Sequence, residues 1–99
     1  MHAMLVVTKM DPTKHDAQRR ELEERIVPIV KQAPGFISGT WMIDRGDGRA
    51  SSMIVLDTEE GARQFAAMLQ QQAASGEWAA KGVSLESSLV GEVQAHPGK

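Results

Sequence analysis

The chain has 99 residues, enough for one hydrophobic core and too few for two. Its 41% hydrophobic and 24% charged residues are ordinary globular values, which argue against disorder. A formal net charge of −2 predicts no broad surface for nucleic acid or for an anionic membrane. Because the chain has no cysteine, disulfides, thiol catalysis and thiolate metal sites are excluded.

No apolar run approaches the roughly 20 residues that span a bilayer. Residues 1–7 lack both the basic leader and the apolar length of a signal peptide. We therefore expect a cytoplasmic protein without a membrane partner. We expect a single domain over residues 1–99, with its ordered core at about residues 2–93.

The first half of the chain predicts a strand followed by a long helix. Residues 2–10 are rich in β-branched residues and too short for a helix before the Asp11-Pro12 pair, so they predict a strand that is apolar on both faces. Asp11 is the expected helix cap, with Thr13 as the alternative. Pro28 should kink or loosen the last turn before residue 32. The apolar stripe of this helix is Leu22, Ile26, Ile29 and Val30.

The middle of the chain predicts a β-hairpin. Residues 36–44 and 49–56 predict strands joined by a turn, in which both Gly46 and Gly48 are expected to take positive φ.

The last part of the chain predicts a second helix and a fourth strand. Asp57 and Glu60 have the spacing of a capping box, and the helix that follows has the apolar stripe Ala62, Phe65, Ala66, Leu69 and Ala73. Residues 83–93 predict a strand by regular alternation, and the end of the chain, with Pro97 and Gly98, is expected to fray.

The order β-α-β-β-α-β predicts an α+β, ferredoxin-like fold with both helices on one face of a four-stranded antiparallel sheet. Either parity of the strands leaves large apolar side chains on the uncovered face, which is unusual for a monomer. In the first strand the two sets are Leu5 and Val7 against Met4, Val6 and Met10; in the second they are Ile37, Trp41 and Ile43 against Phe36 and Met42. We expect a homodimer that packs sheet against sheet, over at least about 1,200 Å² of interface.

Residues 28–41, with Pro-Gly-Phe before the second strand, resemble the helix-to-strand joint of antibiotic-biosynthesis-monooxygenase-like proteins, the dimeric α+β barrel superfamily. The Asp-Thr-Glu-Glu helix start after the third strand is similar as well. The resemblance covers about residues 2–93 and implies the fold more specifically than the activity. The superfamily includes cofactor-free oxygenases, haem-degrading enzymes and small isomerases.

Haem degradation is not what the resemblance implies for this chain. Haem-degrading relatives carry an Asn where this chain has Val7 and a Trp where it has Phe65, and their haem-ligating His follows on the second helix. No histidine lies between Phe65 and Val83, and the chain contains neither Asn nor Tyr. We therefore expect no haem and no other cofactor.

The three histidines are the first candidates for acid–base chemistry. His2 and His96 lie near the ends of the chain and are expected on the surface, which leaves His15 as a weak candidate for a catalytic base. No two histidines have metal-ligand spacing, so no metal site is expected.

A ligand pocket is expected between the helices and the sheet, with Val7, Phe65, Met68 and Trp78 around it. The inner stripes contain no Arg or Lys, which argues against phosphorylated or dicarboxylate ligands. One hypothesis is a small dimeric monooxygenase-like enzyme that oxidises a flat aromatic or quinol-type metabolite. The alternatives are a ligand-binding dimer without turnover and a purely structural dimer. A cavity with a buried polar group favours the enzyme, a cavity without one favours binding, and a filled core favours the structural role.

Overall fold

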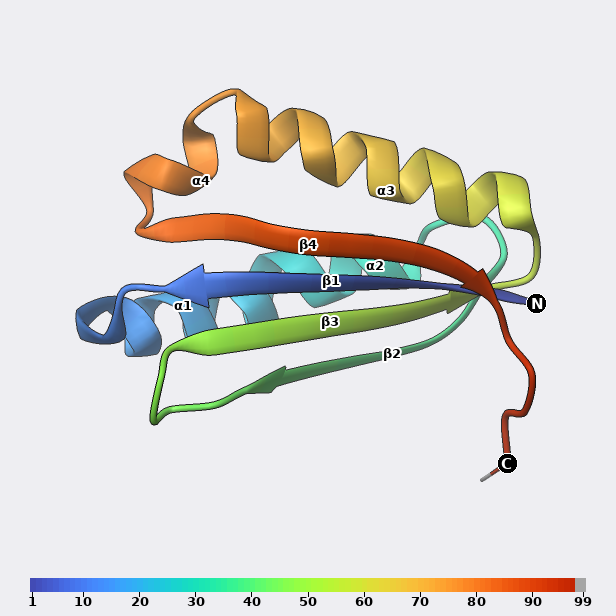
Figure 1. The fold of residues 1–99 in the computed structure, drawn as a ribbon, viewed down its shortest axis with the longest axis horizontal. Coiled ribbons are helices and arrows are strands. Elements are labelled where there is room, and N and C mark those ends of the chain that lie inside the picture. Colours follow the sequence, from blue (N-terminus) through green and yellow to red (C-terminus); the bar gives the residue numbers. More distant parts are fainter. Residues whose placement is uncertain (98–99) are drawn as a thin grey trace.

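Four antiparallel strands form one sheet in the order β2-β3-β1-β4, in a computed structural model that describes residues 1–97. Gly98, part of the end expected to fray, lies outside the described residues. The helices cover one face, and α3 runs along β4 (Figure 1). The ferredoxin-like α+β prediction is thus confirmed. The strands are β1 His2–Met10, β2 Phe36–Ile43, β3 Arg49–Leu56 and β4 Val83–Glu92.

The first helical stretch is continuous but irregular. Asp11 caps it, because its Oδ1 accepts hydrogen bonds from the backbone N–H of Thr13 at 2.9 Å and from the Thr13 hydroxyl at 2.7 Å. The stretch consists of a 3-10 turn η1 (Pro12–Lys14), α1 (His15–Glu21), a π-helical segment η2 (Leu22–Ile26) and α2 (Val27–Lys31).

The π-helical segment ends just before Pro28, which has no backbone N–H to donate to the preceding turn. The N–H of Val27 bonds instead to the carbonyl of Leu22, five residues back. The wider turn rotates the residues that follow it. Ile29, predicted to belong to the buried stripe, is therefore 61% exposed, whereas Val30 is buried.

The second helix is α3 (Glu59–Ala74), followed by the short α4 (Glu77–Ala80). The predicted cap at Asp57 is wrong. Thr58 caps α3, because its hydroxyl oxygen accepts from the backbone N–H of Gly61 at 3.0 Å. The backbone N–H of Asp57 donates to the carbonyl of Gly35 at 2.9 Å. Asp57 therefore continues the pairing of the hairpin, and the helix begins after it.

Two irregularities change which side chains face the helices. In β2 the register shifts between Phe36 and Ser38, so Phe36 packs against the same core as Trp41 rather than sharing a face with Met42, as alternation predicted. In β4 the register shifts opposite Val7 and Thr8. That shift brings both Leu85 and Val90 against the core, although regular alternation places them on opposite faces.

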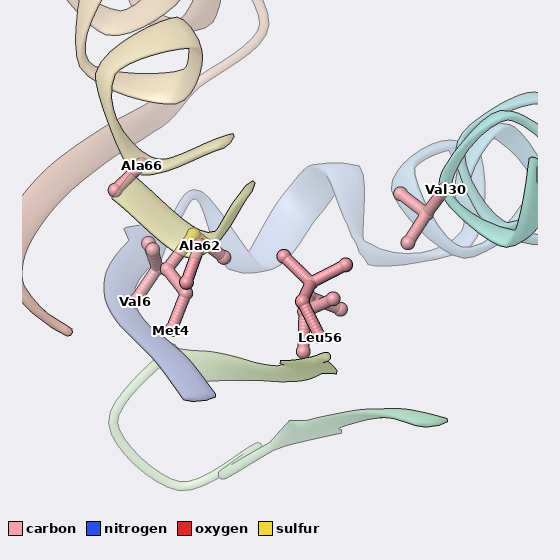
Figure 2. Packing of buried hydrophobic residues seen from close by; sticks show 7 residues of the cluster. Met4, Val6, Val30, Leu56, Ala62 and Ala66 are labelled. Atoms are coloured by element: carbon pink, nitrogen blue, oxygen red, sulfur yellow. The ribbon is translucent and has the colours of Figure 1, made fainter. Parts of the chain in front are cut away.

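The core lies between the sheet and α3. Met4, Ile54 and Leu56 are the largest fully buried side chains, and each contributes about 1.5–3 kcal/mol by its burial. Ala62 and Ala66 on α3 are small enough for that helix to approach β1 closely, and Figure 2 shows them above Met4 and Val6. Val30 from α2 lies across from them.

The opposite face of the sheet carries exposed apolar side chains. Met42, Met53 and Leu89 are 69%, 46% and 63% exposed, and register places Leu5 beside the last two. The helices described are too short or too polar to cross a membrane. The C-terminal segment is docked at least to His96, whose ring lies 3.4 Å from the hydroxyl of Ser38.

The hairpin turn allows a test of how tightly β1 and β3 are joined. Only Gly48 takes positive φ (+79°) in that turn, not both glycines as predicted. A Cβ on Gly48 would lie 2.8 Å from the backbone carbonyl of Met10, whereas a Cβ on Gly76, at φ +87°, would meet nothing within 4 Å.

We expect Gly76→Ala to destabilise the fold by about 1–2 kcal/mol, the cost of the left-handed conformation alone. Gly48→Ala should destabilise it more, because two backbone segments must also move apart. Chemical denaturation of both variants measures the difference, and equal losses would contradict the prediction.

Candidate functional site

A cavity of about 490 Å³ lies above the sheet, between the first helical stretch and α3. It forms because the helices cover different parts of the sheet: α3 packs on β4 and β1, whereas α2 packs on β2. The strands between them are left as the floor. The core is therefore not filled, which removes the observation that would have favoured a purely structural role.

The walls of the cavity are largely apolar and aromatic. Trp41 from β2, Phe65 from α3 and Trp78 from α4 all line it, so both tryptophans of the chain and one of its two phenylalanines meet at one space. Aromatic rings from three separate elements favour a flat apolar ligand, because aromatic faces stack and exclude water.

The structure brings three of the four predicted pocket residues together. Phe65, Met68 and Trp78 line the cavity, whereas Val7 does not. Val7 alternates with the buried Val6 and pairs with Ser51 and Ser87, so its side chain belongs to the opposite face of the sheet. From β1 the cavity receives Val6 and Thr8 instead.

His15, the candidate base, does not line the cavity. It is the first residue of α1, and its Nε2 atom is buried without a hydrogen-bond partner among the described residues. A general base must come within hydrogen-bonding reach of the proton that it removes, so His15 does not suit a ligand in this cavity. His2 and His96 do not line the cavity either.

Three residues with hydroxyl groups line the cavity on the side of the sheet, Thr8, Ser51 and Ser52, and none of them was predicted there from the sequence. Thr8 donates a long hydrogen bond of 3.5 Å to the carbonyl of Ala50. Ser52 lies between Val6 and Trp41 across the sheet, and its hydroxyl makes no hydrogen bond within the described part of the chain. Once it is known that Val6 faces the helices, the alternation of side chains along β1 and β3 predicts that Thr8 and Ser52 face them as well.

Charged side chains form one rim of the cavity. The Nζ of Lys81 lies 2.7 Å from Oε1 of Glu21, and a guanidinium nitrogen of Arg25 lies 3.3 Å from the same oxygen. Glu77 lies 3.8 Å from Lys81 and 3.9 Å from Arg25, and Gln18 donates to the carbonyl of Lys81 at 2.8 Å. The inner stripes of the helices do lack Arg and Lys, as read from the sequence, but the rim supplies both.

Residues 1–97 contain no group of His, Cys, Asp or Glu side chains arranged to hold a metal ion. The two carboxyls with displaced pKa values lie outside the cavity. The Thr13 hydroxyl and backbone N–H lower the pKa of Asp11, and Arg63 lowers that of Glu59, in both cases by hydrogen bonding to the ionised form.

No polar or charged residue is fully buried in the part of the chain that the structure describes. By the criterion set from the sequence, a cavity without a buried polar group favours ligand binding. The polar groups that a ligand would meet are the floor hydroxyls and the partly exposed rim.

No family model and no curated protein sequence matches this chain. Solved structures do. The haem degrader MhuD from Mycobacterium tuberculosis, with two haems bound in its active site, matches at a TM-score of 0.73 and 17% identity, over 99% of this chain and 100% of its own.

Two further structures match over nearly the whole chain. A proposed antibiotic biosynthesis monooxygenase from Deinococcus radiodurans matches at a TM-score of 0.72 and 16% identity, over 100% of this chain and 98% of its own. A protein described as dimeric and ferredoxin-like, from an uncultured marine organism, matches at a TM-score of 0.67 and 12% identity, over 99% of this chain and 98% of its own. At such identities the likeness is one of fold. The chain therefore has the fold of the antibiotic-biosynthesis-monooxygenase-like proteins, as the residues around Pro34-Gly35-Phe36 indicated.

Proposed function

We propose that this protein binds a small, flat, largely apolar aromatic molecule of the quinol type between its helices and its sheet, and acts on it as a monooxygenase-like homodimer. The observation that carries the proposal is the cavity, of about 490 Å³, with Trp41, Phe65 and Trp78 around it. Its volume falls within the range typical of small-molecule sites, about 300–1,000 Å³.

Oxidation without metal or haem is compatible with these residues. A quinol-type substrate that loses a proton becomes electron-rich enough to react with oxygen itself, so the protein must supply an apolar space and a proton acceptor. The rim carboxylates are better placed than His15 to accept that proton, because they line the cavity and His15 does not. Binding without turnover is the alternative, and it is favoured by the absence of a fully buried polar residue among residues 1–97.

A titration with quinol and anthrone compounds tests the proposal. Because both tryptophans line the cavity, binding should quench the intrinsic fluorescence. Phe65→Ala should weaken binding by about 1–3 kcal/mol through lost apolar contact. Oxygen consumption with the same compounds then separates an enzyme from a binding protein.

Met53→Ala is the matched control for Phe65→Ala, because Met53 lies on the opposite face of the sheet and does not line the cavity. Met53→Ala should bind the same compounds with the affinity of the unchanged protein. If no compound of the panel quenches the fluorescence, the proposed function is wrong.

The homodimer is proposed from the uncovered face of the sheet. Leu5, Met53 and Leu89 are adjacent on β1, β3 and β4, and the last two are about half exposed or more. An apolar patch that extends over three strands is most simply covered by the same patch of a second copy, since an isologous interface is self-complementary.

We expect Leu89→Glu to turn the dimer into a monomer, because a carboxylate from each copy would then be buried in the apolar interface. Light scattering at micromolar concentration should give twice 10.8 kDa for the unchanged protein and 10.8 kDa for the variant. Ala67→Glu is the control, because Ala67 is exposed on α3, on the other side of the sheet from the apolar patch. A monomeric unchanged protein would contradict the prediction.

We also expect no tight haem binding, although a haem degrader shares the fold. The argument from Val7 no longer applies, since Val7 faces away, but no histidine is among the residues that line the cavity. A haem titration should therefore show no stoichiometric Soret shift. If a shift appears and survives His15→Ala, the prediction is wrong.

A further inference from the structure

The charged rim of the cavity is organised around one carboxylate. Lys81 and Arg25 both approach Oε1 of Glu21, at 2.7 and 3.3 Å. The shortest contact of each cation with this carboxylate is thus to the same oxygen, Oε1. A carboxylate has about four acceptor positions on its two oxygens, so Oε2 keeps capacity to accept a further hydrogen bond.

Glu21 is also the least exposed acid of these ion pairs. Its side chain is 24% exposed, against 61% for Glu23, which pairs with Arg19 at 3.0 Å on the same rim. A partly buried carboxylate that is held by two cations is oriented, so it is better placed to accept a hydrogen bond from a ligand than an exposed, mobile carboxylate is.

The remaining charge around Glu21 is balanced. Arg25 comes from the π-helical segment, Lys81 follows α4, and Glu77 on α4 lies within 4 Å of both cations. Because the two cations offset the two carboxylates, this cluster offers little net attraction to an anion. It does offer an acceptor for a neutral hydroxyl that reaches the end of the apolar cavity.

We infer that Glu21 is a specificity-determining residue that selects ligands with a hydroxyl on the aromatic ring. The hydroxyl donates to Oε2 of Glu21 while the ring lies among Trp41, Phe65 and Trp78. The reduced, quinol form of a ligand is then preferred over its quinone or methyl ether, because neither of these has a proton to donate. This inference rests on the proposed function and names the ligand chemistry of the same cavity.

An uncharged pair of probes tests the inference. 1-Naphthol and 1-methoxynaphthalene have the same ring system, and only the first donates a hydrogen bond. Fluorescence titration should show that the unchanged protein binds 1-naphthol about tenfold more tightly, the ratio expected for a hydrogen bond to a charged group. In Glu21→Gln, the two probes should bind with nearly equal affinity, so the ratio of their dissociation constants should be close to one.

Two further variants separate hydrogen bonding from a structural effect. Glu23→Gln removes a second carboxylate of the rim and should keep the preference for 1-naphthol. Lys81→Met removes the shortest ion pair to Glu21 but leaves the carboxylate and its contact with Arg25, so the preference for 1-naphthol should remain.

The possible failures are distinguishable. Equal affinities in the unchanged protein would overturn the inference and leave the proposed function standing. Loss of the ratio in Lys81→Met as well as in Glu21→Gln would show that the ion pair only shapes the cavity, and would also overturn the inference. If neither probe binds, the proposed function fails, and the inference fails with it.

Discussion

β1 is hydrogen-bonded along both of its edges, to β3 and to β4, and its alternation decides which side chains reach each face of the sheet. Met4 and Val6 reach the helices and are buried, whereas Leu5 and Val7 reach the other face. A shift of one residue would exchange the two sets. The core, the floor of the cavity and the proposed dimer surface therefore depend on the same pairing.

The cavity follows from unequal packing of the helices on that sheet. Alanines at positions 62 and 66 let α3 lie close to β1, whereas α2 contributes a single buried side chain, Val30. The π-helical segment before Pro28 changes the direction of the inner face of that helix. The space between the layers is then bordered by rings from three separate elements, an arrangement suited to binding a flat molecule.

The polarity of the cavity is uneven, and this matters for the proposed function. Most of the wall is apolar, while hydroxyls lie on the floor and Glu21, Arg25 and Lys81 lie at the rim. The rim ion pairs are partly exposed, so each adds little to stability by itself. Their clearer effect is to hold a carboxylate at one end of an apolar space, where it can orient a ligand that has one polar edge.

The sequence by itself determined the fold, the strand ranges and most of the aromatic wall. The two-residue alternation of strands and the 3.6-residue period of helices are local properties of the sequence. They located β1 and β3 to the residue and placed Phe65 and Leu69 on the inner side of α3. Tertiary structure alone decided the features that depend on register or on distant residues. A bulge placed Phe36 with Trp41, a π turn exposed Ile29, and the parity of β1 removed Val7 from the cavity. Glu21 and Lys81, 60 residues apart, meet only when α1 and α4 are packed on the sheet. No local pattern encodes such a contact, because its energy depends on packing that forms after the elements do.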